Sequence, residues 1–368
     1  MYNRSWTVID FGQLKKNYAA CEGALGKGQQ IMAVVKADAY GHGDGEVAKC
    51  FADCGCKNFA VSNLDEARNL RSAGVEGQIL ILGYTPANLA KRLAELDITQ
   101  ALLSEEYADL LASECQKQDV KIKAQFAIDT GMNRIGLDAD NVENCMQSLA
   151  KYAKLFDLNG IFTHFAVADG KDEKSIAFTK GQLSKFKAVA EHPGVKALNL
   201  SFVHCQNSAG GLFTESYGNL VRFGIVLYGL KPDYNLELPI DVRPALSWKS
   251  VISMVKTVHA GESIGYGCTF TAEKEMQIAT VPTGYADGYS RRLSGCGKVL
   301  VGKTLSPVVG RVCMVQLMID VSGLNVQIGE EVYLLSDAYN ADDMAKDIVT
   351  IGYEIICGIS KWVPKERV

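Results

Sequence analysis

One lysine at the end of an apolar run is the residue best placed for covalent chemistry. Residues 31–35 form a continuous apolar run, Lys36 follows directly, and a turn containing Gly41 and Gly43 comes next. Such a run is typical of a strand buried on both faces. A lysine at its mouth is either a solvated cap or an amine in a partly dry site, where a lowered pKa lets it form a Schiff base with an aldehyde. Tyr40 and the two glycines, which let the backbone approach a ligand, favour the second interpretation.

Groups suited to anions follow later apolar runs. Arg134 lies in the glycine-containing loop 129–136, where it either presents a guanidinium to an anion or is a solvated arginine of a surface turn. Ser208 follows another run and offers a hydroxyl suited to a phosphate. Residues 222–225 supply an arginine and backbone N–H groups. The alternative for Gly224 is a glycine that only marks the limit of a strand.

Two histidines and one tyrosine are further candidates for proton chemistry. His164 and His204 each end an apolar run, in a chain with only five histidines. A lone histidine is more often structural than catalytic. The position of both histidines at predicted strand ends makes the catalytic interpretation stronger than it would be for one of them alone. Tyr266 lies between two glycines, where a tyrosine is more often a packed turn residue than a base.

Composition limits the classes of protein and partner. The chain has 368 residues, of which 48% are hydrophobic and 22% are charged, as in a globular protein of perhaps two domains. The net charge of −4 gives no reason to expect nucleic acid or an anionic membrane as a partner. No apolar stretch approaches the roughly 20 residues of a membrane helix, and the first residues lack the apolar segment of a signal peptide.

The cysteines indicate a reducing compartment and no metal site. Eleven is an odd count, and the cysteines are scattered without metal-ligand spacing apart from Cys54 and Cys56. We therefore expect reduced thiols, and the cytoplasm as the location.

The elements that must position these residues alternate in type. Apolar, β-branched runs are separated by segments rich in helix formers, such as 65–72, 87–96, 140–152 and 175–190. Eight such alternations predict a parallel (β/α)8 barrel with its site at the carboxyl ends of the strands, whereas an open doubly wound sheet would usually carry a Gly-x-Gly-x-x-Gly turn after its first strand. The expected strands are 30–36, 59–62, 79–82, 100–103, 123–128, 158–164, 200–204 and 223–228.

The pattern changes after Pro232. Short valine- and isoleucine-rich runs broken by glycine turns predict a mainly antiparallel β domain, followed by a helix and turn over 341–353. The runs are 248–258, 277–283, 298–301 and 331–335. We place the two domains at residues 1–238 and 239–368.

Residues 34–43 are similar to the cofactor-lysine motif of the alanine racemases, which are barrel-type pyridoxal-phosphate enzymes. The resemblance recurs at six later places and spans nearly the whole chain. It implies a pyridoxal 5'-phosphate cofactor, a small amino-acid substrate and a supply of D-alanine for peptidoglycan. It also implies that a first strand at about residues 5–10 joins the β domain. The enzyme would be a homodimer in which Tyr266 completes the partner's site.

The resemblance assigns roles to the candidate residues. Lys36 and Tyr266 become two bases on opposite faces of the substrate carbon, with His164, Arg222 and His204 in support. Arg222 would hydrogen-bond the pyridine nitrogen and leave it unprotonated, which separates a racemase from a decarboxylase that carries a carboxylate there. The resemblance implies that the remaining cofactor contacts come from Tyr40, Ser208, Gly224, Ile225 and Tyr353; the substrate contacts from Arg134 and Met314; and the substrate corridor from Asp169, Tyr285, Arg291 and Tyr353.

The sequence departs from the family pattern around the pocket. Ala127 stands where many members carry a carbamylated lysine, Val315 replaces the usual aspartate, and residues 361–365 lack the usual flanking arginines. These changes leave open a serine racemase of the vancomycin-resistance type, which would make the chain the cytoplasmic domain of a larger membrane protein. A non-catalytic pyridoxal-phosphate carrier is the third possibility, although such proteins typically consist of the barrel alone.

Overall fold

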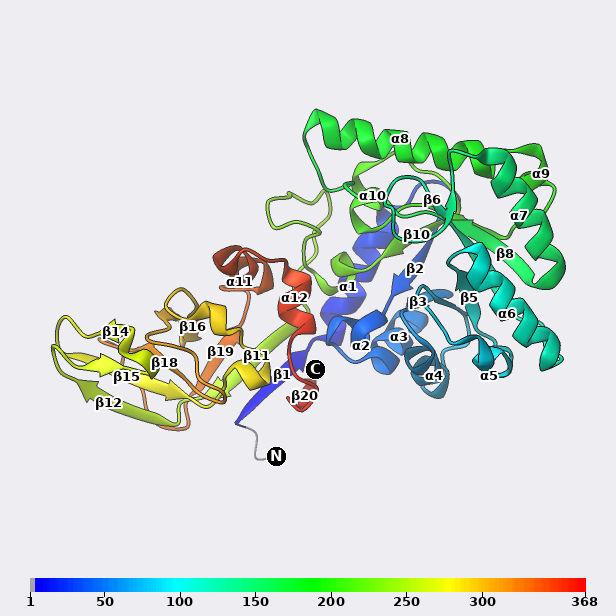
Figure 1. Ribbon diagram of the computed structural model, residues 1–368. Helices are drawn as coiled ribbons and strands as arrows, with labels where there is room; N and C mark the ends of the chain where they lie inside the picture. The colour runs from blue at the N-terminus through cyan, green and yellow to red at the C-terminus, as the bar shows by residue number, and fades with distance from the viewer. Residues whose placement is uncertain (1–3) are drawn as a thin grey trace.

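The computed structural model describes residues 4–368, which form a barrel and a β-rich unit side by side (Figure 1). Eight parallel strands follow one another in the order β10-β2-β3-β4-β5-β6-β8-β9, and β10 lies against β9 to nearly close the barrel. Helices surround the strands, with α8 drawn across the top of the barrel in Figure 1. The predicted fold class, a (β/α)8 barrel followed by a mainly antiparallel β domain, is confirmed.

Bounds of the barrel elements agree with the sequence pattern at most positions. The strands are β2 Gln30–Val34, β3 Asn58–Val61, β4 Gln78–Ile81, β5 Thr99–Leu102, β6 Lys123–Asp129, β8 Asp157–Phe162, β9 Phe202–His204 and β10 Leu220–Phe223, and a short β7 (Leu137–Asp138) pairs with β6. The helices are α1 Phe11–Gly23, α2 Lys36–Tyr40, α3 Asp44–Asp53, α4 Leu64–Ser72, α5 Ala90–Glu95, α6 Glu105–Lys117, α7 Val142–Leu155, α8 Glu173–Ala190, α9 Pro193–Lys196 and α10 Ser208–Phe213, with 3-10 turns η1 Ala87–Leu89 and η2 Ile225–Tyr228.

Local sequence explains where these elements begin and why they pack. Asn63, Ser104 and Asp172 each accept a hydrogen bond from a backbone N–H of the first turn of the following helix. Every residue of β3 and β5 is buried, as expected for strands covered on both faces. These caps and buried runs fix the carboxyl ends of the strands on one side of the barrel.

Two predicted strands were wrong in detail. The prediction over 223–228 fails because Gly224 leaves the extended conformation and Ile225–Tyr228 turns into η2, where the Tyr228 hydroxyl donates to the Val34 carbonyl. The prediction over 248–258 covers two strands in different sheets. The Ile252 N–H pairs with Glu330, whereas the Ser253 N–H pairs with Thr280, so the chain changes sheet between these residues.

The β domain contains three sheets. The largest has the order β17-β16-β19-β11-β1-β20, so the first strand of the chain lies in it, antiparallel to β11. A second sheet has the order β12-β15-β18, and β13 pairs with β14. The strands are β1 Ser5–Ile9, β11 Leu246–Val251, β12 Met254–Val258, β13 Ser263–Ile264, β14 Phe270–Thr271, β15 Met276–Val281, β16 Lys298–Val301, β17 Thr304–Pro307, β18 Leu317–Asp320, β19 Glu331–Leu335 and β20 Lys365–Arg367.

Short helices connect this unit to the barrel. They are α11 Ala341–Ile348 and α12 Gly352–Cys357. The β domain also contains the 3-10 turns η3 Tyr266–Cys268, η4 Tyr285–Asp287 and η5 Arg291–Leu293. In Figure 1 α11 and α12 lie between the two units, and α12 contacts α2. The second unit therefore reaches the mouth of the barrel in which Lys36 lies.

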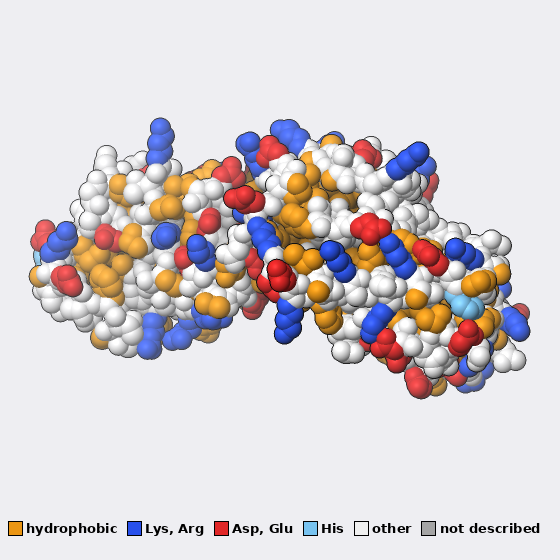
Figure 2. Space-filling view, turned by 90° about the horizontal axis from the view of Figure 1, so that it is seen from above, with side chains coloured by type: hydrophobic (Ala, Val, Ile, Leu, Met, Phe, Trp, Pro, Cys, Tyr) orange, Lys and Arg blue, Asp and Glu red, His pale blue; other side chains and the backbone are white. Residues whose placement is uncertain are grey.

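Figure 2 shows acidic and basic side chains interspersed with hydrophobic ones over the face in view, without a field of one sign. Within residues 4–368 no helix combines the length and the apolar character that crossing a bilayer requires.

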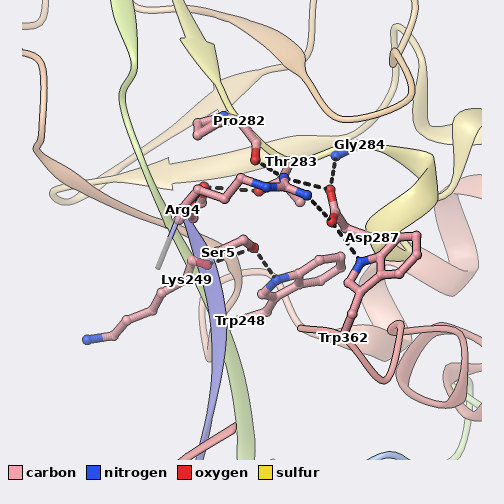
Figure 3. Close-up of polar contacts among 10 residues, drawn as sticks. Arg4, Ser5, Trp248, Lys249, Pro282, Thr283, Gly284, Asp287 and Trp362 are labelled. Atoms are coloured by element: carbon pink, nitrogen blue, oxygen red, sulfur yellow. Dashed lines mark hydrogen bonds and ion pairs between the residues drawn. The ribbon is translucent and has the colours of Figure 1, made fainter. Parts of the chain in front are cut away.

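A buried carboxylate ties the N-terminal strand to the turn that carries Tyr285 (Figure 3). Asp287 is 1% exposed, and its oxygens accept hydrogen bonds from Arg4 at 2.6 and 2.9 Å, from Trp362 Nε1 at 3.1 Å and from the Gly284 N–H at 3.0 Å. Arg4 also donates to the Pro282 carbonyl. One carboxylate thus joins three segments that are distant in the sequence.

Replacing Arg4 by methionine should destabilise the protein, because it leaves the buried carboxylate of Asp287 without its cation. Arg4 is 44% exposed, so we expect a moderate loss of about 1–3 kcal/mol in the free energy of unfolding. Urea unfolding followed by tryptophan fluorescence measures it, with Arg92→Met at a surface pair as the control. An unchanged midpoint for Arg4→Met would contradict this role.

Candidate active site

Two cavities meet at Lys36, at the carboxyl ends of the barrel strands. We call them the Ser208 cavity, of about 210 Å³, and the Arg134 cavity, of about 370 Å³, after a residue that lines each one alone. The residues common to both cavities are Lys36, Leu82, Met132, His164 and Arg222. Lys36 therefore lies where a ligand extending from one cavity into the other would pass.

The backbone after Lys36 forms a left-handed turn. Ala37, Asp38, Ala39 and Tyr40 have φ of 54°, 56°, 51° and 53°, and Gly41 continues at 83°. For residues with a Cβ this conformation costs roughly 1–2 kcal/mol each. Strain of this kind persists only where surrounding contacts hold it, and it is concentrated at functional sites.

Long-range contacts hold the turn in place. Glu66 accepts the Ala37 N–H at 2.8 Å, and Asp38 accepts the Asp44 N–H at 3.1 Å and the Lys365 ammonium at 3.0 Å. Glu66 is itself held by the Ser62 N–H at 2.7 Å. These contacts fix the direction in which Lys36 and Tyr40 leave the backbone.

The far end of the Ser208 cavity has the groups that a phosphate requires. Tyr40, Ser208, Gly224, Ile225 and Tyr353 line it, and the rings of Tyr40 and Tyr353 lie 5.9 Å apart. The Ser208 hydroxyl accepts the Gly224 N–H at 2.9 Å. A Cβ on Gly224 would meet the Tyr40 hydroxyl at 2.6 Å, so only glycine lets this hydroxyl approach the backbone. Hydroxyls and close backbone N–H groups fit the phosphate of pyridoxal phosphate.

Arg222 is a buried cation without a carboxylate partner among the described residues. Its guanidinium donates to the carbonyls of Thr163 and Cys205 at 2.7 and 3.1 Å, and to Nδ1 of His204 and of His164 at 2.6 and 3.2 Å. Burial lowers the pKa of Arg222 to about 10, which leaves it protonated at neutral pH. Its orientation is therefore fixed by neutral acceptors.

Both histidines beside Arg222 are neutral. Burial, followed by the positive charge of Arg222, lowers the pKa of His164 and of His204 well below the ordinary value. Because an Arg222 N–H faces each Nδ1, we infer that the proton of each neutral ring is on Nε2. His204 is wholly buried behind Arg222, whereas His164 lines both cavities.

Lys36 has the electrostatics of a nucleophile or base. The Lys36 side chain is exposed to solvent in the two cavities that it lines. Desolvation and then the positive charge of Arg134 lower the pKa of Lys36. Neutral amine is therefore available at a lower pH than for a surface lysine.

Arg134 lies in the predicted loop and faces the cavity named after it. Within residues 4–368 no carboxylate lies at ion-pairing distance from its guanidinium. Ala127 is buried beside it and supplies no polar group, while the Asp129 carboxylate accepts the N–H groups of Gly131 and Asn133 and shapes the loop. Arg134 is thus available to an anion.

Four candidate residues do not join Lys36 within one chain. Neither cavity at Lys36 includes Tyr266, Met314, Tyr285 or Arg291 among its described lining residues. Tyr266 lines a separate, open hollow of about 760 Å³ and is 70% exposed. The strand that follows it, β14, lies at the end of the β domain remote from the barrel in Figure 1. Asp169 and Tyr353, in contrast, do line the Ser208 cavity.

Tyr285 and Met314, two of these exposed residues, lie on neighbouring turns. The Tyr285 N–H donates to the Cys313 carbonyl at 3.0 Å, and the Ala286 N–H donates to the Met314 carbonyl at 2.9 Å. A Cβ on Gly284 would meet the Cys313 carbonyl at 2.2 Å, so the close approach of the two turns requires glycine. Tyr285 and Met314 are thus held next to each other and exposed, outside the lining of the two cavities at Lys36.

The sequence analysis missed Leu82 and Met132, which line both cavities. Leu82 follows the last residue of β4, so its place at a strand end was an available signal. Met132 lies in the same loop as Arg134, and no feature of the sequence marks it as a residue of the site.

Replacing Lys36 by methionine should change the stability of the cofactor-free protein in a pH-dependent way. A lysine whose pKa is lowered in the folded state destabilises that state below the folded pKa, and the penalty disappears as pH rises through the unfolded value of about 10.4. Lys36→Met should therefore gain stability over wild type at pH 7, and the gain should shrink toward pH 10.

Urea midpoints across this pH range measure the gain, with Lys27→Met, at an exposed loop lysine, as the control. A gain that grows with pH would contradict the lowered pKa.

Comparison with known proteins identifies the family. Residues 9–232 match the model of the alanine racemase N-terminal domain, and residues 245–367 match that of the C-terminal domain. Alanine racemase 1 of Bacillus subtilis is 40% identical, over 99% of this chain and 93% of its own length.

Solved structures agree along the whole chain. The alanine racemase of Clostridium difficile 630 superposes with a TM-score of 0.92 at 34% identity, covering 100% of this chain and 96% of its own. That of Bartonella henselae, with covalently bound pyridoxal phosphate, has a TM-score of 0.88 at 27% identity, covering 99% of each chain. The protein described here belongs to the alanine racemase family.

Proposed function

We propose that this protein interconverts L- and D-alanine with pyridoxal 5'-phosphate, using Lys36 of one subunit and Tyr266 of the other as two bases. The observation that carries the proposal is that Lys36 and Arg222 face the same two cavities. When bound, the cofactor supplies an electron-withdrawing ring that acidifies the substrate Cα–H.

The cofactor's place follows from the two cavities. Tyr40, Ser208, Tyr353 and the N–H groups of Gly224 and Ile225 would hold its phosphate, and Lys36 would bond its aldehyde carbon. Arg222 would donate to the pyridine nitrogen without giving up its proton. With its nitrogen unprotonated, the ring would withdraw electrons less strongly, which would suit racemisation better than transamination.

Lys36 serves one face of the substrate carbon. A general base must be unprotonated, and the lowered pKa of Lys36 makes the neutral amine available at a lower pH than for a surface lysine. A racemase must also deliver a proton to the opposite face, so a second acid–base group is needed there.

Tyr266 of a second subunit is our candidate for that group, and it makes the enzyme a homodimer. Tyr266, Met314, Val315 and Tyr285 are each more than 40% exposed, which is unusual for large apolar side chains and fits a surface covered by a partner. His164 carries its proton on Nε2, so it can donate to the phenolate oxygen and help Tyr266 to ionise.

Positive groups would receive the substrate carboxylate. Arg134 approaches it from the barrel, and the Met314 N–H approaches it from the partner subunit. Asp169 and Tyr353 from the barrel side, with Tyr285 and Arg291 from the partner, would line the corridor. Eleven free cysteines fit a reducing compartment, so we place the enzyme in the cytoplasm.

The domain division at 238/239 remains a proposal. It falls between the two family matches, which end at residue 232 and begin at residue 245.

Serine is the alternative substrate, suggested by the departures from the family pattern at Ala127 and Val315. An apolar pocket rejects an added hydroxyl poorly, so discrimination against serine should be modest. Tyr353 narrows the cavity beside Tyr40 and favours alanine.

The wild-type enzyme should therefore turn over L-alanine faster than L-serine, by a factor of about 10–100 in kcat/KM. Coupled assays of D-alanine and D-serine formation measure the ratio. A ratio below one would assign the enzyme to serine.

Lys36→Ala should abolish the visible absorbance of lysine-bound cofactor and lower kcat at least about 1000-fold, because both the covalent link and one base are lost. Lys171→Ala, at an exposed lysine outside both cavities, is the control. Racemisation at the wild-type rate in Lys36→Ala would refute the proposal.

Tyr266→Phe should lower kcat by about 100-fold or more while the cofactor absorbance remains, because only the second base is removed. Activity and absorbance are measured on the same sample. Full activity in this variant would rule out the two-base scheme.

A further inference from the structure

Arg222 depends on His204 for its orientation. The distance from its NH1 to His204 Nδ1 is 2.6 Å, the shortest hydrogen bond of this guanidinium. An arginine can only donate, so Nδ1 must offer a lone pair. His204 therefore has to be neutral with its proton on Nε2.

Gln125 accepts a hydrogen bond from this Nε2–H group. Its Oε1 lies 2.8 Å from His204 Nε2, and both side chains are fully buried. Gln125 belongs to β6, and its paired residue on β8, Gly160, leaves room for the amide, since a Cβ there would meet Gln125 Cδ at 3.0 Å. Phe162 stacks on the imidazole with ring centroids 5.3 Å apart, which holds the ring plane.

We propose that Gln125 is a positioning residue that locks His204 in its Nε2–H tautomer and thereby orients Arg222 toward the cofactor's ring nitrogen. The inference rests on the proposed function only in this last step, the role of Arg222. The hydrogen-bond chain from Gln125 through His204 to Arg222 belongs to the cofactor-free protein itself.

An amide at this position has a specific advantage. Gln125 neither gains nor loses a proton, so the chain of hydrogen bonds ends on a group of constant charge. If His204 were doubly protonated, Nδ1–H would face the NH1 donors of Arg222, and two buried cations would adjoin. The Nε2 of Gln125 has no hydrogen-bond partner among the described residues, so the contact with His204 is the one hydrogen bond that this amide makes within residues 4–368.

Nitrogen-15 NMR of histidine-labelled, cofactor-free protein tests the tautomer directly. The chain has five histidines, and His204→Gln assigns the signal. We expect His204 to be neutral with the proton on Nε2 in the wild type, and to lose this single tautomer in Gln125→Met, which has no acceptor. A wild-type His204 that is charged, or protonated on Nδ1, would overturn the proposal.

Gln100 on the adjacent strand β5 provides a matched control. It is also fully buried, with one unpartnered amide atom, but it donates to the Gly83 and Ala101 carbonyls and has no link to Arg222. Gln100→Met should leave the His204 signal unchanged. The proposal fails if Gln125→Met and Gln100→Met affect that signal equally.

Kinetics of the cofactor-loaded enzyme tests the consequence for Arg222. Misplacing a group at the reacting centre lowers the rate, so Gln125→Met should reduce kcat for alanine about 10- to 100-fold with KM changed less. Gln100→Met should not show this loss.

An unchanged kcat in Gln125→Met, with the tautomer lost, would refute the role in orienting Arg222. Absence of racemisation in the wild type would instead refute the proposed function, while the NMR result stands on its own.

Discussion

A buried guanidinium without a counter-charge is the constraint on which this site depends. Burying a cation is costly unless its N–H groups find hydrogen-bond acceptors. A buried arginine is usually paired with a carboxylate. The Arg222 guanidinium instead donates hydrogen bonds to two carbonyls and to two neutral imidazoles. Because a carboxylate is absent from this shell, Arg222 can face the ring nitrogen as a donor whose charge is not already neutralised.

The same charge shapes its neighbours. It contributes to the lowered pKa of His164, His204 and Lys36, and in each case desolvation acts in the same direction. The site therefore holds neutral imidazoles, and an amine with a lowered pKa, next to Arg222 and Arg134. Such an arrangement suits a ligand that brings two anions, a phosphate at one end and a carboxylate at the other.

Backbone strain complements this electrostatic arrangement. The left-handed turn after Lys36 lets one short segment send Lys36 to the junction of the cavities and Tyr40 to the phosphate end. Glu66 and Lys365, which hold the turn, come from different units of the fold. The β domain thus supports the site within its own subunit.

The sequence predicted best those residues that follow buried strands. Lys36 and Ser208 follow apolar runs that were predicted as strands, so their convergence follows from the barrel. Arg222 instead precedes the run predicted over 223–228 and lies within β10. The left-handed turn had no signal, because Ala37–Tyr40 contains no glycine and its support comes from distant residues. Gln125 lay hidden inside a run read only as a strand, and η2 was read as a strand because its residues are apolar.

Pairing two inactive chains tests most directly whether each site is shared between subunits. Lys36→Ala and Tyr266→Phe chains, carrying different tags, are co-expressed, and the mixed dimer is isolated through both tags. The account predicts that one of its two sites has both bases, so the mixed dimer should recover about half of the wild-type activity per dimer. A mixed dimer as inactive as either parent would show that Lys36 and Tyr266 do not serve the same carbon from two subunits.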